Sequence, residues 1–331
     1  MPVPTMRDPI VLAQVKKSAY TLGEQLRSRC FVDLSRDPAS SVLLLSDARS
    51  GSTWVADLIN QERAYRYMFE PFHPRVVKPA ARPNMFQYLA CDEDAPEFRQ
   101  FTERVLNGQF RYPRVDRYNR QLVSRERLIK DVTANLFAGW IQSEFPSARI
   151  VLLLRHPFGV AVSKEATKYW TWPGVSELTR QPALVADFLE DYIDELTCED
   201  DPLLEQVYMW AVLHYVPLHQ LDPRAVHLAF YEHFCIDPAA ELERVLAFLD
   251  GPDGKRRSIR GSLDTDTPSV MSRGDSAARS GRKPIDEWQE SFTGPRLQRG
   301  REIRERFGLG SLYSGLMPDR DAATELLRTR V

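Results

Sequence analysis

A short run of small and polar residues around an arginine is the part of this sequence best suited to chemistry. The apolar segment 42–45 is followed by Ser-Asp-Ala-Arg-Ser-Gly-Ser-Thr-Trp at positions 46–54, and apolar residues then return with the spacing of a helix. A buried strand, a small-residue loop and a helix start, in this order, predict a site for a phosphate-like anion, because the free N–H groups of a first helical turn point toward such a ligand.

The loop is close to the ATP-binding pattern G-x-x-x-x-G-K-[ST] but departs from it at two positions. Ser46 stands where the first glycine is required and Ser52 where the lysine is required, while Arg49 lies inside the loop. The lysine of that pattern holds the terminal phosphates of a nucleoside triphosphate. Its absence favours a phosphate-like ligand of another kind.

A second candidate anion site follows the apolar run 149–154. Arg155 comes directly after that run, Pro157 suits the first turn of a helix, and Ser163 lies about two helical turns further on. One arginine fork and one hydroxyl can therefore face the same phosphate. Taken singly, these residues are also compatible with a solvated strand cap and an ordinary helix; combined with the loop at 46–54, they favour an anion site.

Both sites require a scaffold that brings strand ends together. Five apolar or β-branched segments are predicted as strands, namely Val42–Ser46, Tyr65–Phe69, Arg127–Val132, Arg149–Leu154 and Ala225–Phe230. Most are followed by helix-like periodicity, which predicts an α/β fold: a P-loop-like, three-layer α/β/α arrangement around a central, mostly parallel sheet of about five strands. The two anion sites then fall at the carboxyl ends of strands, where ligands of such sheets bind.

Longer segments interrupt this alternation. Residues 74–124 and 169–202 are rich in Pro, Tyr, Trp and Arg and are predicted as irregular lid segments that contact the acceptor. Residues 251–294 are predicted as a long loop before a closing helix at 295–307. The predicted organisation is a helical N-terminal lead-in, one main domain and a C-terminal tail or helix, at residues 1–40, 41–310 and 311–331.

Composition places the chain among globular proteins without an overall electrostatic field. Its 331 residues are 43% hydrophobic and 27% charged, with a formal net charge of −2. Such a charge gives no general attraction to nucleic acid or to an anionic membrane, so anion binding must be local. The four cysteines are scattered and no metal-ligand spacing is present, so no metal is expected. The absence of a long apolar run and of a signal peptide predicts a cytoplasmic protein with no membrane span.

Taken together, the two anion motifs resemble those of the sulfotransferase superfamily. The family's loop for a 5′-phosphosulfate reads R-S-G-[ST]-[ST] and corresponds to positions 49–53. Its 3′-phosphate motif reads R-x-P-x-x-x-x-x-S and corresponds to Arg155, Pro157 and Ser163. The family's R-Y-E-D-L element is similar to Phe-Tyr-Glu-His-Phe at 230–234, a weaker match.

A late segment also resembles the family, and two positions depart from it. Residues 279–281, followed by Trp288, are similar to the family's R-K-G loop, which closes on the nucleotide. Next to Arg155, however, His156 replaces the usual aspartate and Phe158 replaces a basic residue. The late loop also carries extra residues before its tryptophan. These departures affect the surroundings of the 3′-phosphate motif but keep its arginine and serine.

The resemblance implies transfer of a sulfuryl group from 3′-phosphoadenosine 5′-phosphosulfate (PAPS) to an acceptor hydroxyl by in-line displacement, with PAPS as co-substrate and Arg49 stabilising the leaving group. It implies that PAPS is held by two sets of residues, first Arg49, Ser50, Gly51, Ser52, Thr53 and Trp54 and then Arg155, Ser163, Arg279, Ser280 and Gly281.

The resemblance also suggests residues for proton transfer and charge stabilisation. Glu70, in the Phe-Glu-Pro element 69–71, follows a predicted strand and is the expected general base, because carbohydrate and tyrosylprotein members of the family carry a glutamate at a comparable place. His73 is the rival base. Lys130 resembles the lysine of the family's K-x-H element, which helps hold the sulfuryl group, although Val132 stands where the histidine would be. Salt bridges are the structural alternative for Glu70 and Lys130.

The Phe-Glu-Pro element favours a carbohydrate acceptor, with tyrosine or a small-molecule alcohol as alternatives. The aromatic residues of 169–172 are expected either to line the acceptor site or to pack a lid. Two other classes of function stay open. A P-loop kinase or NTPase-like phosphotransferase would share the strand, loop and helix, but the Gly-Lys pair and a clear strand-ending aspartate for Mg²⁺ are missing. A binding module would keep the nucleotide site without turnover.

Overall fold

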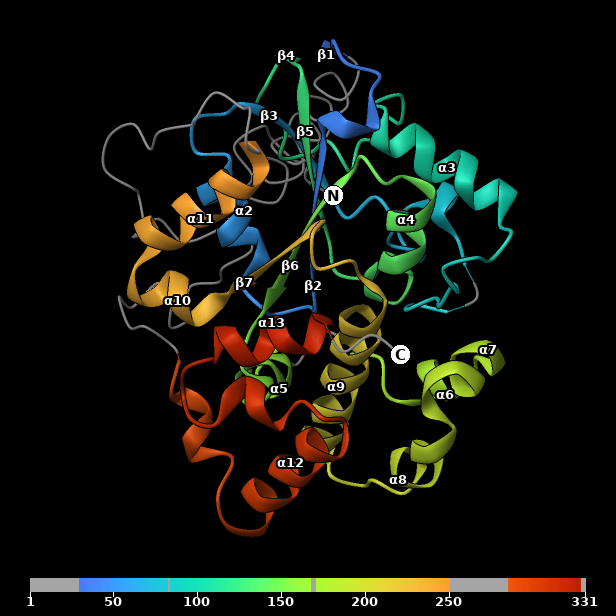
Figure 1. Ribbon diagram of the computed structural model, residues 1–331. Helices are drawn as coiled ribbons and strands as arrows, with labels where there is room; N and C mark the ends of the chain where they lie inside the picture. Colours follow the sequence, from blue (N-terminus) through green and yellow to red (C-terminus); the bar gives the residue numbers. More distant parts are fainter. Residues whose placement is uncertain (1–29, 83, 168–170, 251–284, 329–331) are drawn as a thin grey trace, which may run out of the picture.

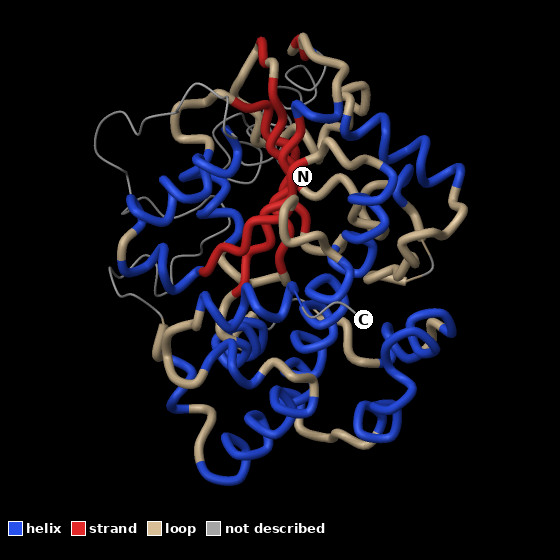
Figure 2. The backbone as a smooth tube through the Cα atoms, in the orientation of Figure 1, coloured by secondary structure: helices blue, strands red, loops and turns tan. Residues whose placement is uncertain are grey.

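A five-stranded sheet forms the centre of the protein (Figures 1 and 2). The computed structural model describes residues 30–82, 84–167, 171–250 and 285–328. The strand order is β3-β5-β2-β6-β7, and every neighbouring pair is parallel. The strands are β2 (Ser41–Ser46), β3 (Tyr65–Phe69), β5 (Glu126–Asp131), β6 (Arg149–Leu154) and β7 (Val226–Phe230).

The predicted α/β fold with a sheet of about five strands is confirmed. Two predicted strands have the observed bounds, and the other three differ by one residue at one or both ends. The pairs of this sheet are all parallel, where a mostly parallel sheet was predicted. A separate parallel pair, β1 (Val32–Asp33) with β4 (Val123–Ser124), was not predicted, because two residues carry no periodic pattern.

Alternating side chains of the strands supply two apolar layers, since successive residues of a strand point to opposite faces. In β2, Val42 and Leu44 join one buried cluster, whereas Leu43 and Leu45 join the other. The helices α2 (Ser52–Ile59), α10 (Tyr231–Ile236) and α11 (Pro238–Asp250) cover the first face. The second cluster draws on α3 (Pro96–Leu106), α4 (Ala138–Glu144), α5 (Pro157–Glu165), α9 (Pro202–Gln220), α12 (Gly294–Arg306) and α13 (Arg320–Arg328). The predicted three layers are therefore present.

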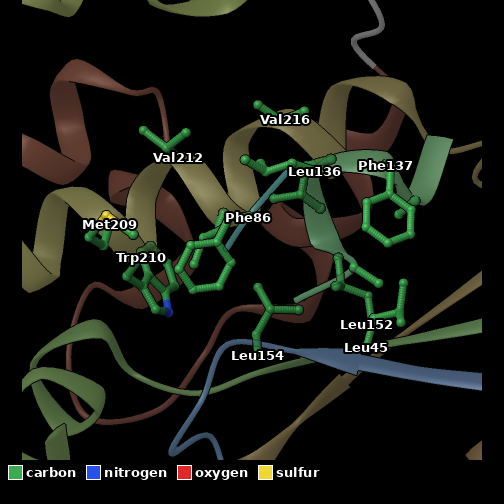
Figure 3. Close-up of a cluster of buried hydrophobic side chains, with 14 of the residues drawn as sticks. Leu45, Phe86, Leu136, Phe137, Leu152, Leu154, Met209, Trp210, Val212 and Val216 are labelled. Atoms are coloured by element: carbon green, nitrogen blue, oxygen red, sulfur yellow. The ribbon is translucent and has the colours of Figure 1, made fainter. Parts of the chain in front are cut away.

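Helix α9 is the central element of the second layer. Met209, Trp210, Val212 and Val216 are fully buried, so the helix is apolar on most of its circumference, as expected for a helix enclosed by others. Figure 3 shows these side chains gathered with Leu154 of β6 and with other strand and helix residues. None of the described helices is both long and apolar enough to cross a bilayer.

The two predicted lid segments contain regular helices rather than irregular chain. Within 74–124, the residues Phe98, Phe101 and Val105 recur at helical spacing and bury one face of α3. Within 169–202 lie α6 (Ser176–Thr179), α7 (Pro182–Leu184) and α8 (Ile193–Thr197). The predicted closing helix is α12, shifted by one residue. Most of the predicted N-terminal lead-in, residues 1–29, lies outside the described residues.

The buried side chain of Arg66 fixes the segment that runs along the outer edge of β3. Its guanidinium donates to the carboxylate of Asp116 over 2.8 and 3.0 Å, to the carbonyl of Gly108 over 2.9 Å and to that of Phe110 over 2.5 Å. The Arg66 side chain is 0% exposed, and Asp33 of β1 is a further ion-pair partner at 3.5 Å. One arginine thus donates to several buried acceptors that would otherwise have no hydrogen-bond partner.

We expect Arg66→Met to lower the free energy of unfolding by about 3–5 kcal/mol, because it leaves a buried carboxylate and two carbonyls without their donor. Urea unfolding measures the loss. The matched control is Arg125→Met, at an exposed arginine, for which a change within about 0.5 kcal/mol is expected. Equal losses for the two variants would show that the network contributes little.

Candidate active site

The loop after β2 turns into a helix through two residues with positive φ. Arg49 and Gly51 both adopt left-handed conformations, with φ angles of 69° and 80°. Helix α2 begins directly afterwards at Ser52, and the N–H of Val55 donates to the carbonyl of Gly51. The N–H groups of the first turn of α2 have no partner within the helix, and they lie at the carboxyl end of β2.

Arg49 joins the two predicted anion motifs. Its Nε donates to the hydroxyl of Ser163 on α5 over 3.1 Å. Its carbonyl accepts a hydrogen bond of 2.8 Å from the guanidinium of Arg155, at the end of β6. The strands that carry Arg49 and Arg155 are neighbours in the sheet. The structure therefore brings together the arginine and serine of the second motif at the loop of the first.

Tyr231 lies beneath this junction. A Cβ atom at Gly51 would come within 2.4 Å of the Tyr231 ring, and the guanidinium of Arg155 stands 4.5 Å from the ring centroid. Trp54 contacts the same ring edge-on at 5.9 Å. Sequence analysis gave Tyr231 no role in the site, although the similarity at 230–234 was a signal for it. The ring explains why a glycine is needed at position 51.

A buried ion pair between Asp47 and Lys164 links the motifs a second time. The Lys164 ammonium is 2.8 Å from the Asp47 carboxylate, and the two side chains are 3% and 0% exposed. Lys164 follows Ser163 directly, and Asp47 precedes Arg49 by two residues. The pair was not predicted, because Asp47 and Lys164 occupy positions at which the two motifs specify no residue. Breaking one partner of such a pair is costly, so it holds the loop against α5.

The departures at His156 and Phe158 are accommodated by aromatic stacking. His156 stacks on Trp288 with ring centroids 4.4 Å apart, and Phe158 stacks on Phe292 at 4.1 Å. Burial, reinforced by two arginines, lowers the pKa of His156 well below its ordinary value, so the ring is neutral at pH 7. The late segment near Trp288 therefore packs beside Arg155 through apolar rather than charged contacts.

Glu70 and Lys130, two of the predicted site residues, form an ion pair. Glu70 follows β3 with a left-handed φ of 51°, and its carboxylate accepts from the Lys130 ammonium over 2.7 Å. Arg114 approaches the other carboxylate oxygen to 3.4 Å. His73 lies three residues after Glu70, and its backbone N–H donates to the carbonyl of Glu70. The Nδ1 atom of His73 is buried without a hydrogen-bond partner among the described residues.

Opposing effects set the protonation of these groups. Burial alone would raise the pKa of Glu70, but the Lys130 ammonium, with His73 and Arg114, outweighs it and lowers that pKa below 4.5. Burial lowers the pKa of His73 below 6.5 despite the opposing effect of the Glu70 carboxylate. Glu70 is thus an ionised carboxylate and His73 a neutral imidazole at pH 7.

Some predicted site residues cannot be placed. Arg279, Ser280 and Gly281 lie outside the described residues, as do the first two aromatic residues of 169–172. Trp172 is described, and its indole N–H donates to the carbonyl of Lys164 over 2.8 Å. Within the described ranges, no group of three or more His, Cys, Asp or Glu side chains could hold a metal ion.

A sequence profile described as the sulfotransferase family matches residues 41–253, which include both anion motifs and the ends of β3 and β5. The chain belongs to the sulfotransferase family. The predicted membership is therefore confirmed, and the protein is a sulfotransferase by family. A search among curated protein sequences finds no match.

Solved structures similar to this sulfotransferase are distant in sequence. The sulfotransferase domain from the curacin biosynthetic pathway is 16% identical, with a TM-score of 0.43, covering 84% of this chain and 99% of that one. Mouse sulfotransferase SULT7A1 complexed with PAP is 14% identical, with a TM-score of 0.43 and 90% coverage of both chains. Retinol dehydratase in a complex with retinol and PAP is 16% identical, with a TM-score of 0.39, covering 87% and 85%.

We expect Gly51→Ala to destabilise this sulfotransferase by about 1–3 kcal/mol, because alanine disfavours the left-handed conformation and its Cβ would overlap the Tyr231 ring. Thermal unfolding measures the change. Gly315→Ala is the control, since a Cβ there meets nothing within 4 Å and should leave the stability nearly unchanged. A Gly51→Ala protein as stable as the wild type would contradict a tight contact between loop and ring.

Proposed function

We propose that the chain transfers a sulfuryl group from PAPS to an acceptor hydroxyl. The observation that carries this proposal is the double contact of Arg49 with Ser163 and Arg155. It supports the proposal because the predicted 5′-phosphosulfate loop then lies beside the arginine and hydroxyl predicted for a 3′-phosphate. A ligand with anionic groups at both positions of the ribose would occupy both.

The donor set of the loop fits such a ligand. The hydroxyl of Ser50 is buried and has no hydrogen-bond partner among the described residues, so it has a donor to offer. The free N–H groups at the start of α2 and the guanidinium of Arg49 add further donors around it. These residues would hold the 5′ end. PAPS would supply the activated sulfuryl group, and Arg49 would stabilise negative charge on the departing phosphate.

The acceptor side is assigned to Glu70. Its carboxylate is ionised at neutral pH and can accept the proton of an acceptor hydroxyl, while Lys130, held 2.7 Å away, offers positive charge next to it. His73 is the alternative base. The Phe-Glu-Pro element, similar to that of carbohydrate sulfotransferases, leads us to propose a carbohydrate hydroxyl as the acceptor.

Incubation with PAPS carrying labelled sulfate and a mixture of sugar acceptors tests the proposal. We expect labelled product from the wild type and a drop of about a hundredfold in kcat/KM for PAPS in Arg155→Met, because a charged fork to a phosphate is lost. Arg224→Met, at an arginine whose side chain is 89% exposed, is the control. Equal kcat/KM values for the two variants would show that Arg155 does not bind the donor.

We expect Glu70→Gln to lower kcat by about 10²–10⁴ with little change in the KM for PAPS, because the amide cannot take a proton but keeps the shape of the side chain. His73→Gln is the matched comparison and should lower kcat far less. Steady-state kinetics at pH 7 separates the two. The opposite order of losses would assign the base to His73.

The pH profile of kcat/KM gives an independent check. Glu70 must be ionised to act, so its acid limb should lie below pH 4.5, where its lowered pKa falls. Lys130→Met removes the main stabilisation of the carboxylate and leaves burial, which raises the pKa. We expect the acid limb of this variant to move toward neutral pH. An acid limb that does not move would show that ionisation of Glu70 does not control kcat/KM.

A further inference from the structure

We propose that the acceptor is an anionic sugar whose charged group, a carboxylate or a phosphate, binds Arg114 and Arg117 while its hydroxyl meets Glu70. This inference rests on the proposed function, because it assigns the acceptor side of the same site. It depends on four features: the order of the charged groups across the sheet, the fixed position of the segment 108–119, the three cationic groups around Phe69, and the unused donor capacity of Arg114.

The charged groups follow the strand order. The loop with Arg49 lies at the end of β2, Lys130 lies near the end of β5, and Glu70 follows the end of β3, which is the edge strand. Neighbouring strands are about 4.8 Å apart, so β3 ends about 10 Å from the donor loop. Arg114 belongs to the segment beyond that edge. The backbone at Arg114 therefore lies beyond β3, on the side away from the donor loop, and its side chain reaches Glu70 from there.

The segment 108–119 is held rigidly along β3. Besides the buried Arg66 network, the N–H of Phe69 donates to the carbonyl of Val115 over 2.8 Å. Asp116, which accepts two bonds from Arg66, lies between Arg114 and Arg117 in the sequence. Both arginines thus project from a fixed backbone, which is the requirement for a binding group rather than a mobile surface charge.

Positive charge dominates at this end of β3. The ring of Phe69 has three cationic groups around its centroid: the Lys130 ammonium at 4.8 Å, the Arg114 guanidinium at 5.7 Å and the Arg117 guanidinium at 5.8 Å. The aromatic ring attracts these cations through cation–π interactions and so offsets part of their mutual repulsion, but it carries no negative charge. Like charges held together in this way favour an anionic ligand.

Two carboxylates near this end of the sheet, Glu70 and Asp131, already have partners. Glu70 is engaged mainly by Lys130. Asp131 is fully buried and already accepts from the N–H of Phe72 and from both donors of Thr133. Burial, with the nearby Glu70 carboxylate, raises the pKa of Asp131 to about 6. Both carboxylates are thus already engaged by other donors.

Arg114 is not saturated by Glu70. Its distance to that carboxylate is 3.4 Å, longer than the 2.7 Å from Lys130. Its Nε is buried without a hydrogen-bond partner among the described residues, and 30% of the side chain remains exposed. A guanidinium offers five donors in a fork that fits a carboxylate or a phosphate. The side chain is therefore both reachable and short of acceptors.

Three methyl glucopyranosides that differ only at C6 test the inference: the neutral glucoside, the glucuronide and the 6-phosphate. Their binding to the enzyme saturated with 3′-phosphoadenosine 5′-phosphate (PAP) is measured by calorimetry, and their sulfation with labelled PAPS. We expect at least about tenfold tighter binding and higher kcat/KM for the two charged probes, as for one charge-assisted contact. Arg114→Gln should reduce this ratio about tenfold, Arg114→Lys should retain part of it, and the exposed Arg125→Gln should keep it.

A charged-to-neutral ratio of one or less, absence of binding by both charged probes, or a ratio that Arg114→Gln leaves unchanged would overturn the inference. Circular dichroism confirms that the variants are folded. Failure of the proposed function would give a different result. The wild type would then neither bind PAP nor transfer labelled sulfate from PAPS to any acceptor.

Discussion

The contact between the loop after β2 and the start of α5 is the constraint on which the site depends. Two parallel neighbours, β2 and β6, end side by side, and Arg155 donates across that gap to the carbonyl of Arg49. Arg49 in turn reaches Ser163, and the buried pair of Asp47 and Lys164 joins the same two segments. Without this junction, the loop and the strand-end arginine would be two separate turns rather than one site.

The junction also explains residues that carry no charge. Gly51 is required because the Tyr231 ring occupies the space of a side chain, and that ring lies under Arg155. Glu232, next to Tyr231, accepts from the N–H of His156 over 2.8 Å and thereby fixes the chain where α5 begins. The elements around the anion motifs thus act as supports that set their positions.

Much of the fold could be predicted from the sequence, because apolar strands of a parallel sheet are continuous buried runs with sharp polar ends. The strands β3 and β6 were predicted with their observed bounds. The helical pattern of α3 was present at Phe98, Phe101 and Val105 but was hidden in a segment interpreted as irregular. The surrounding Pro and Arg residues of 74–124 are typical of irregular chain and mask this short helical period.

The parts of the site that escaped prediction are non-local. The Asp47–Lys164 pair joins residues 117 positions apart, and neither residue has a sequence signal of its own. The place of Arg114 beside Glu70 depends on the buried Arg66 and on Val115. Local patterns predict strand ends and loops, whereas such contacts follow from how distant segments pack.

The central claim is that one site holds two anionic groups of one nucleotide. Calorimetric titration without Mg²⁺, comparing PAP with adenosine 5′-phosphate, tests it most directly. We expect one site per chain and about a hundredfold tighter binding of PAP, from the added contacts of Arg155 and Ser163 with the 3′-phosphate. Equal affinities for the two nucleotides would overturn this conclusion, as would a second titration in which ATP with Mg²⁺ binds more tightly than PAP.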